Sequence, residues 1–316
     1  MDTDLENTDS QGHTDAEADS GLSVADHLTS TGAVVVAVDG SEHAEDALAW
    51  AADHASLHHR PLAVVSVWEP VPSMWLDTTG INHTVLYAEL ASAGADRVKV
   101  AAEKARSLHP ELSIETAVGR GDVRGELLRL SKRASLLVLG SRGRGPIRSL
   151  LLGSVSAAVA RHALGPVVVV RPCGSGGGGI LVGIDGTERS MGAVTAAYEQ
   201  AAATGQHLTV LHCFWDARVA YAGAMVVDES DDAADVRALV AETTAGLAEK
   251  HPDVDVEVRI VRGLADQVLV AESQGRDLVV LGYHRQHALG EALFPSVVTS
   301  VLEHAHGAVM VVPARD

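Results

Sequence analysis

Cysteine is scarce in this sequence, which has 316 residues and two cysteines, Cys173 and Cys213. The two stand far apart and outside any CxxC or Cys/His spacing, so they support neither a disulfide framework nor a zinc site. A chain that does not depend on disulfides suits a reducing compartment. We therefore expect a cytoplasmic protein.

Aromatic residues are also few, with 4 Trp, 4 Tyr and 2 Phe. Val, Leu, Ile and Ala must fill the core, and this composition favours buried parallel strands and Ala-rich helices over a β-sandwich. No apolar run approaches the roughly 18 residues of a membrane span. The N-terminus has neither the basic nor the apolar region of a secretion signal, so we expect no membrane association and no secretion.

Positive charge is in short supply, since 24 Lys and Arg stand against 42 Asp and Glu and the net charge is -18. Nonspecific nucleic-acid binding needs a cationic face, so we exclude nucleic acid as a partner. Residues 1–30 hold eight acidic residues and no Lys or Arg. This segment has little to bury, and we predict a disordered acidic tail whose simplest role is to keep the protein soluble.

The chain contains an internal repeat. The segment VVVAVDGS at residues 34–41 returns as ILVGIDGT at residues 180–187, and later landmarks recur in the same order. Such self-similarity indicates a tandem duplication. A Gly-rich stretch over residues 173–179 lies between the copies and is typical of a flexible connector. We predict a first domain over residues 31–172 and a second over residues 180–316.

Each copy alternates short Val-rich runs with longer Ala-rich stretches, which predicts right-handed crossovers and a parallel sheet. The expected fold class is α/β, with two tandem five-stranded, doubly wound, Rossmann-like domains. Ligands of such sheets bind beyond the carboxyl ends of the strands. Asp39 and Gly140 would face each other there if the first and fourth strands are neighbours. The first copy has predicted strands over 33–38, 62–68, 112–118, 135–140 and 166–171, and predicted helices over 42–59, 83–109, 122–133 and 153–163.

A glycine-rich loop follows the fourth strand and reads Gly140-x2-Gly143-x9-Gly153-Ser154. Glycines let backbone N–H groups converge on an anion, and a helix that begins near Gly153 adds its unpaired donors. We interpret the loop as a phosphate cradle, while each glycine taken alone also fits an ordinary strand-to-helix turn. Neither a P-loop nor a GxGxxG turn is present. Hydroxyls and positive charge come from Ser154, Ser156, Arg142, Arg144 and Arg148.

Across residues 32–313 the chain resembles the universal stress proteins in their tandem-domain form. The resemblance rests on the Val38-Asp39-Gly40-Ser41 end of the first strand, on Gly121, and on the glycine loop, which is the ATP-binding signature of that family. It implies that Asp39 lies close to the adenosine, that Val67 meets the base through its backbone, and that the loop holds ribose and phosphates. Taken alone, Asp39 equally fits a turn beside Gly40.

The cofactor implied by the resemblance is ATP, with or without Mg2+. The residues expected to bind it all belong to the first copy: Val38, Asp39, Gly40, Val67, Gly121, Gly140, Arg142, Gly143, Gly153, Ser154, Val155 and Ser156.

The second copy departs from the signature. Its loop reads Gly282-x2-Arg285-x9-Pro295-Ser296, so two of the three glycines are replaced. Arg285 is bulky where the backbone would approach a phosphate, and Pro295 removes an N–H donor. We expect one nucleotide site, in the first copy. The alternative is that Arg285 itself pairs with a phosphate.

Turnover of a bound triphosphate needs a positioned base and usually a metal held by carboxylates. Residues 140–160 contain no Asp, Glu or His, which leaves Asp39 and Asp122 as candidates. The 16 histidines form no metal-ligand pattern, so we expect no catalytic residues and no metal site. We predict a regulatory stress-response protein that binds ATP and hydrolyses it weakly at most. A slow ATPase and a nucleotide-free scaffold remain as alternatives.

The resemblance also has an implication for assembly. It implies that the last strands, at residues 167–170 and 309–312, pair the two domains, which would protect two apolar edge strands. We expect a pseudo-dimer within the chain and a homodimer of chains. The aromatic residues near the ends of the second strands are predicted to cover the edges of the core: Trp68, Trp75, Phe214 and Trp215.

Overall fold

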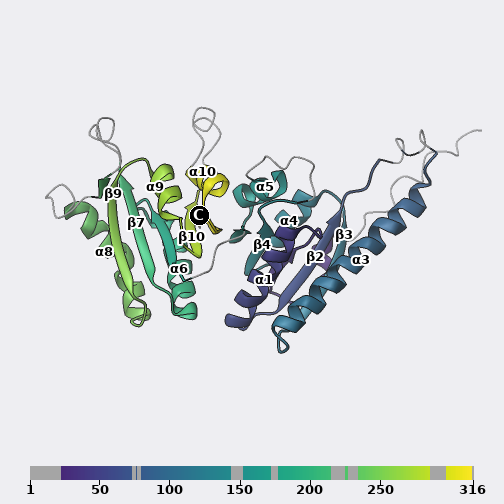
Figure 1. Cartoon of the computed structure of the whole chain (residues 1–316), viewed down its shortest axis with the longest axis horizontal. Helices are drawn as coiled ribbons and strands as arrows, with labels where there is room; N and C mark the ends of the chain where they lie inside the picture. The colour runs from purple at the N-terminus through teal and green to yellow at the C-terminus, as the bar shows by residue number, and fades with distance from the viewer. Residues whose placement is uncertain are drawn as a thin grey trace, which may run out of the picture.

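A computed structural model of the chain describes residues 23–72, 76, 80–143, 152–171, 177–214, 225–226, 234–284 and 297–314. Two halves lie side by side, and each alternates strands with helices (Figure 1). In the first half, every predicted helix and strand is present, with no end displaced by more than two residues. The elements are β1 (Val34–Ala37), α1 (Glu42–Leu57), β2 (Leu62–Trp68), α3 (His83–Leu108), β3 (Ile114–Arg120), α4 (Val123–Ser131), β4 (Leu136–Gly140), α5 (Ser154–His162) and β5 (Val167–Val170).

The second half repeats this order and adds a short strand, β8, at its outer edge. The addition pairs antiparallel with β9 through Met225 and Val226. The elements are β6 (Ile180–Ile184), η2 (Glu188–Ser190), α6 (Met191–Thr204), β7 (Leu208–Phe214), β8 (Met225–Val226), α8 (Ala234–Lys250), β9 (Val256–Arg262), α9 (Ala265–Glu272), β10 (Leu278–Tyr283), α10 (Val297–His304) and β11 (Ala308–Pro313).

All the strands join in one 11-stranded sheet with the order β3-β2-β1-β4-β5-β11-β10-β6-β7-β9-β8. The five repeated strands of each half run parallel to one another, as the doubly wound class requires. The halves meet where β5 pairs antiparallel with β11, and Val168 lies opposite Met310. The expected pairing of the last strands within the chain is therefore present.

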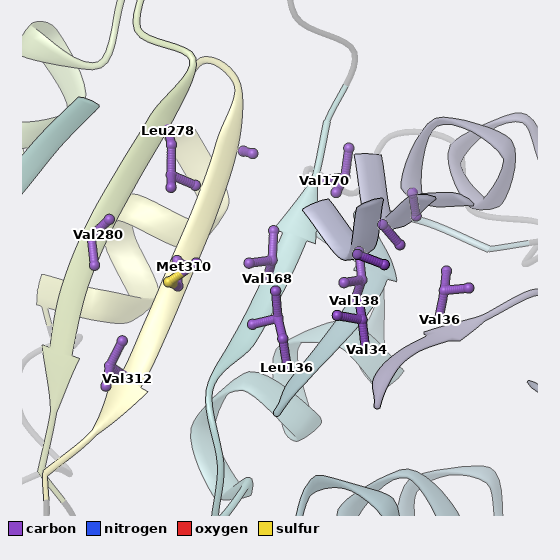
Figure 2. Close-up of a cluster of buried hydrophobic side chains, with 14 of the residues drawn as sticks. Val34, Val36, Leu136, Val138, Val168, Val170, Leu278, Val280, Met310 and Val312 are labelled. Carbon is purple, nitrogen blue, oxygen red and sulfur yellow. The ribbon is translucent and has the colours of Figure 1, made fainter. Parts of the chain in front are cut away.

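The sheet is buried on both faces because successive side chains of a strand point to opposite sides. Val34 and Val36 belong to one core cluster, with residues of α1, α3, α6 and α8, whereas Val35 belongs to the other, with residues of α4, α5, α9 and α10. Figure 2 shows the first cluster continuing from β1 and β4 across β5 to β11 and β10. The seam between the halves is thus filled by the same apolar layer as each half.

Small residues let the first helix lie close to the sheet. The buried face of α1 is almost entirely alanine, and its N-terminus is capped by Ser41, whose side chain accepts a hydrogen bond from the Ala44 N–H. Asn82 and Asp122 cap α3 and α4 in the same way. These caps satisfy helix donors that have no intrahelical partner. Among the described residues, no helix is both long and apolar enough to cross a bilayer.

Residues 23–30, which the sequence analysis assigns to a disordered tail, are folded onto the first half. Val24 begins a short 3-10 helix, η1 (Val24–His27), and is completely buried. It fits a space left by Gly119, where an added Cβ would come within 2.7 Å of the Val24 Cβ. Thr29 and Ser30 donate hydrogen bonds to the Glu115 carboxylate. The acidic composition of the segment, from which disorder is predicted, gives no indication of these contacts. The rest of the predicted tail lies outside the described residues.

Candidate functional site

The site predicted from the sequence lies where β1 and β4 end. These strands are neighbours, with Val34 opposite Leu136 and Val36 opposite Val138. The chain leaves β1 toward β2 on one side, and β4 lies on the other, so this is the topological switch point of the first half. The turn after β1 and the glycine loop after β4 therefore start at the same edge of the sheet.

The two carboxylate oxygens of Asp39 face different parts of the site. One oxygen, Oδ1, accepts hydrogen bonds from the Ser41 N–H at 2.9 Å and the Ser41 hydroxyl at 2.6 Å, which close the turn. Gly40 has a φ of +79° in this turn, a conformation that favours glycine. The turn-forming role of Asp39 is thus present in the structure and employs one oxygen.

The other carboxylate oxygen of Asp39 faces the glycine loop. A Cβ placed on Gly143 would come within 2.6 Å of Asp39 Oδ2, so position 143 has no room for a side chain in this arrangement. The loop is held beside the turn by the backbone of Arg142, whose carbonyl oxygen is 3.5 Å from the Ser41 hydroxyl. The sequence predicts that Asp39 faces Gly140 if β1 and β4 are neighbours. The strands are neighbours, but the glycine that meets Asp39 is Gly143, three residues further along the loop.

The start of helix α5 closes the described part of the loop. Gly153 is its N-cap residue, and no side chain caps the helix there. The Gly153 N–H donates to the Ser141 carbonyl at 2.8 Å, and a Cβ on Gly153 would come within 3.3 Å of the same oxygen. This close approach places the N-terminus of α5, with exposed Ser154 as its first residue, directly beside residues 141–143. A helix N-terminus in this position favours an anion.

Three of the predicted binding residues serve the framework around the site. Gly140 packs on the start of α1, because a Cβ on it would come within 2.5 Å of the His43 carbonyl oxygen. Ser156 is buried, and its hydroxyl donates to the Gly140 carbonyl at 2.7 Å. Val155 packs against the apolar core. Their contacts fix β4, α1 and α5 relative to one another.

The remaining predicted residues lie along the neighbouring strand ends. Val38 is buried, and its N–H donates to the Val65 carbonyl at 2.8 Å. Val67 is half-buried near the end of β2 and lies opposite Gly119. Gly121 follows β3 with a φ of +149° and donates its N–H to the Trp68 carbonyl at 3.0 Å. All these residues stand at the carboxyl edge that also carries Asp39.

An aromatic and cationic pair at this edge recurs in both halves, and the sequence analysis did not identify it. Arg120 lies opposite Trp68 in the sheet register, with its guanidinium 5.6 Å from the Trp68 ring and 4.7 Å from the Tyr87 ring. In the second half, the Arg262 guanidinium is 5.1 Å from the Phe214 ring, at the matching register position. The recurrence of an aromatic residue and an arginine at the ends of paired strands was the available signal.

Positive charge at the site comes from arginines of the first half, one of which, Arg171, lies at the seam with the second half. Burial and the nearby charge of Arg142 lower the pKa of Arg171, and the Glu303 carboxylate opposes the shift. Arg142 and Arg171 are therefore close enough for their charges to repel each other. Arg144 and Arg148, predicted to add to this potential, lie outside the described residues.

The second half holds its matching carboxylate through three hydrogen bonds. Asp185 Oδ1 accepts hydrogen bonds from the Thr187 N–H, the Thr187 hydroxyl and the Ser190 hydroxyl, at 2.9, 2.7 and 2.5 Å. Burial raises the pKa of Asp185, but the hydrogen bonds from Ser190 and Thr187 outweigh burial and leave the pKa below its ordinary value. The altered loop with Arg285, Pro295 and Ser296 lies outside the described residues.

Metal ligands are a separate question from anion binding. Within the described parts of the chain, no three His, Cys, Asp or Glu side chains come together in a group that could hold a metal ion. The described site can thus offer a phosphate backbone donors, a helix N-terminus and an arginine. It offers an adenosine the carboxylate of Asp39 and the strand backbone beside it.

Comparison with known proteins gives a consistent result. A family model described as "Universal stress protein family" matches residues 31–171 and again residues 179–313. A universal stress protein of Mycolicibacterium smegmatis is 33% identical over 289 residues, which cover 89% of this chain and 97% of that protein. Universal stress protein Rv2005c of Mycobacterium tuberculosis is 32% identical over 295 residues, which cover 88% of this chain and 96% of that protein.

A solved structure shares the overall fold. The crystal structure of a universal stress protein from Archaeoglobus fulgidus superposes with a TM-score of 0.61 at 20% sequence identity. The superposition covers 90% of this chain and 98% of that one. The similarity therefore extends over both halves.

Proposed function

Because the chain belongs to the universal stress protein family, we propose that its first half binds ATP, with or without Mg2+, as a regulatory module of a stress response. Binding rather than turnover is the proposed activity. Partner molecules would distinguish the nucleotide-bound protein from the nucleotide-free protein, and this difference would be the regulatory signal.

The meeting of Asp39 with Gly143 is the observation that carries this proposal. The loop passes the turn after β1 so closely that the Asp39 carboxylate occupies the space of a side chain at position 143. A backbone without a side chain can approach phosphate oxygens and donate N–H groups to them. The carboxylate beside it can accept hydrogen bonds from ribose hydroxyls. One ligand with a sugar and a phosphate chain satisfies both groups at once.

The electrostatics of this edge also support an anionic ligand. The first turn of α5 contains no acidic residue, and its N-cap, Gly153, has no side chain to occupy the helix donors. Arg142 adds a positive charge at the base of the loop. In a chain with a net charge of -18, such a concentration of donors and positive charge needs a specific reason, and phosphate binding supplies one.

The second half supports a weaker or absent site. Asp185 is engaged by an additional hydroxyl, from Ser190, at a position where the first half has Ala44. Together with Arg285 and Pro295 in the sequence of the loop, this leads us to propose one nucleotide per chain. Asp39 brings a carboxylate beside Gly143, but no described group of three His, Cys, Asp or Glu side chains could hold a metal there, which supports slow hydrolysis at most.

Nucleotide content and stoichiometry test the proposal. The freshly purified protein would be heat-denatured and its supernatant assayed for adenine nucleotides, and ATP would be titrated into the nucleotide-free protein by calorimetry. We expect one ATP per chain in the wild type and no measurable binding in Gly143→Arg, which copies the second half. Two sites per chain would contradict the single-site proposal, and no binding at all would leave the nucleotide-free scaffold as the better description.

The location and assembly of the protein are also proposals. The acidic composition and the two cysteines support a cytoplasmic location. We propose that two chains associate as a homodimer, which sedimentation velocity over a range of concentrations would detect as a doubled mass. Fluorescent tagging followed by fractionation would test the location.

A further inference from the structure

Arg171 connects the two halves at the edge that carries the proposed site. It directly follows β5, whose last residue, Val170, lies opposite Gly140 in the sheet. The Val170 carbonyl accepts a hydrogen bond from the Ser141 N–H at 2.9 Å. The backbone of Arg171 is therefore anchored where the glycine loop begins.

The side chain of Arg171 reaches into the second half and binds the end of helix α10. Its Nη1 donates to the carbonyl oxygens of Glu303 at 2.9 Å and Ala305 at 3.2 Å, and its Nη2 donates to the Leu302 carbonyl. The last carbonyls of a helix have no intrahelical partner and carry the negative end of the helix dipole. A guanidinium satisfies several of them together, so Arg171 acts as the C-terminal cap of a helix that belongs to the other half.

The same guanidinium experiences the charge at the site. Arg171 is half-buried, and the positive charge of Arg142 acts on it, as the direction of its pKa shift shows. Its Nε is buried without a hydrogen-bond partner among the described residues. A half-buried cation near a second cation is destabilised, and a further negative charge beside the second cation offsets the repulsion. Any anion that binds beside Arg142 would remove part of this repulsion.

The connection is not repeated at the matching position of the second half. The position in the second half that matches Arg171 is occupied by Pro313, which follows the same order of strands and has no side-chain donor. The cap of α5, in the first half, cannot be supplied from β11 in the way that β5 supplies the cap of α10. The two halves therefore have matching strands, but the side-chain contact that Arg171 makes across the seam has no counterpart at Pro313.

We propose that Arg171 is a positioning residue that transmits the occupancy of the first-half phosphate site to helix α10 of the second half. The inference rests on the proposed ATP binding. A phosphate beside Arg142 offsets the repulsion that Arg142 exerts on the guanidinium of Arg171, which is then held more firmly against the α10 carbonyls. Helix α10 follows the degenerate loop of the second half, so the half without the signature would respond to the nucleotide held by the other.

Coupling of this kind is reciprocal. If ATP strengthens the contact of Arg171 with α10 by some factor, the loss of that contact weakens ATP binding by the same factor. Typical couplings between sites correspond to roughly 5- to 150-fold changes in affinity. We expect the lower end here, because α10 is also held by the hydrogen bond from Ser300 to Asp266 and by its packing on α9, α5 and the sheet.

Hydrogen–deuterium exchange of the full-length protein, with and without saturating ATP, tests the proposal. In the wild type, the amides of residues 297–304 should exchange roughly 5- to 10-fold more slowly when ATP is bound, by the coupling expected above. In Arg171→Met, the same amides should exchange faster than in the wild type and should no longer respond to ATP, and calorimetry should show ATP binding that is about 5-fold weaker. Arg171→Lys, which keeps the charge and lacks the fork of donors, should also lose most of the response.

Arg161→Met is the matched control. The Arg161 Nε donates to the Ala157 carbonyl at 3.1 Å, so this arginine also binds a helix carbonyl, but within the first half. Its replacement should leave the response of α10 intact. Binding of ATP to the wild type without any change in α10 exchange overturns the coupling and leaves the proposed function standing. A response that persists in Arg171→Met also overturns it, and an absence of ATP binding overturns both proposals.

Discussion

Gly140 stands so close to His43 that a Cβ on the glycine would come within 2.5 Å of the histidine carbonyl oxygen. The contact joins the end of β4 to the first turn of α1, and therefore fixes the two sides of the candidate site. The matching glycine of the second half, Gly282, is less confined, with its nearest neighbour, the Arg189 carbonyl oxygen, at 3.4 Å. The same residue type thus has a strict packing role in one copy and a looser one in the other.

Alanine substitutions at these two glycines should have unequal effects on stability. Gly140→Ala forces helix α1 away from the strand and should lower the free energy of unfolding by about 1–3 kcal/mol, the usual cost of overpacking. Gly282→Ala should lower it by less than about 1 kcal/mol, because its Cβ has ordinary contact distances. Urea unfolding followed by circular dichroism would measure both. Equal losses would contradict the packing role of Gly140.

Gly143→Ala tests the loop without the bulk of an arginine. The new Cβ would meet Asp39 Oδ2 at 2.6 Å, so the turn and the loop must separate. We expect at least about 10-fold weaker ATP binding, equivalent to about 1.4 kcal/mol. Gly246→Ala is the control, since nothing lies within 4 Å of a Cβ at that position in α8. Unchanged affinity in Gly143→Ala would show that the contact with Asp39 is not part of the site.

Val168→Asp tests the seam between the halves. Val168 is completely buried opposite Met310, and a carboxylate there would have no partner in an apolar layer. We expect a loss of about 3–5 kcal/mol in the free energy of unfolding, or a protein that no longer folds. Val100→Asp is the control, because Val100 on α3 is 65% exposed. A seam variant as stable as the control would show that β5 and β11 do not hold the halves together.

Glu126 should make the attachment of residues 23–30 sensitive to acid. Its buried carboxylate accepts hydrogen bonds from the Ser23 hydroxyl at 2.6 Å and the Val24 N–H at 3.0 Å, and it pairs with Arg129. Burial raises the pKa of Glu126, but these hydrogen bonds from Ser23, Arg129 and Val24 outweigh burial and lower it. A lowered pKa means that the stabilisation is present above the unfolded-state pKa and is lost as the pH falls through the folded-state pKa.

We therefore expect residues 23–30 to lose hydrogen-exchange protection, measured relative to the intrinsic exchange rate at each pH, below about pH 4. In Glu126→Gln the segment should already exchange faster at neutral pH, with a smaller further change in acid. Asp122→Asn, at the exposed N-cap of the same helix, controls for general effects on α4. A segment that stays protected in Glu126→Gln would show that Val24 packing and the hydrogen bonds of Thr29 and Ser30 to Glu115 are enough to retain it.

His54 should weaken the fold in mild acid through a different mechanism. Burial and the charge of His58 lower the pKa of His54 to about 3, and a hydrogen bond with Gln200 opposes the shift. The unfolded chain takes up this proton near pH 6.5 and the folded chain only near pH 3. Stability is therefore complete above about pH 6.5 and falls below it, by up to about 1.4 kcal/mol per pH unit for one proton.

In His54→Gln the slope of the free energy of unfolding between pH 4 and pH 6 should decrease by about one proton. His83→Gln, on an exposed turn of α3, should leave the slope unchanged. Urea titrations at several pH values would give both slopes. An unchanged slope in His54→Gln would show that this histidine is not the source of the acid sensitivity.

Most of the fold follows from patterns that the sequence displays directly. Val-rich runs separated by Ala-rich helices require a parallel sheet buried on both faces, and the repeat of VVVAVDGS duplicates it. The neighbouring positions of β1 and β4 then bring Asp39 to Gly143, because both follow the carboxyl ends of their strands. Local pattern and sheet topology are sufficient for these features.

Other features depend on contacts between distant residues that composition does not encode. Val24 belongs to a strongly acidic segment, and its burial depends on a space that Gly119 leaves on β3. A glycine in a loop can serve a ligand or a neighbouring helix, and the sequence alone could not assign Gly140 to the latter. In the sequence, Arg171 is only the last residue of a predicted strand. Its contact with α10 becomes apparent in the structure, where the end of that helix lies beside it.

Each of the strands at the seam already has a neighbour on both sides: β5 lies between β4 and β11, and β11 lies between β5 and β10. Neither strand has an unpaired backbone edge to offer to a second chain. Any assembly of whole chains must therefore recruit the outer strands or the helical layers, and its symmetry axis would be distinct from the internal one. The duplication has thus placed the edge of the last strand of each half in an interface within the chain, where a second chain cannot pair with it.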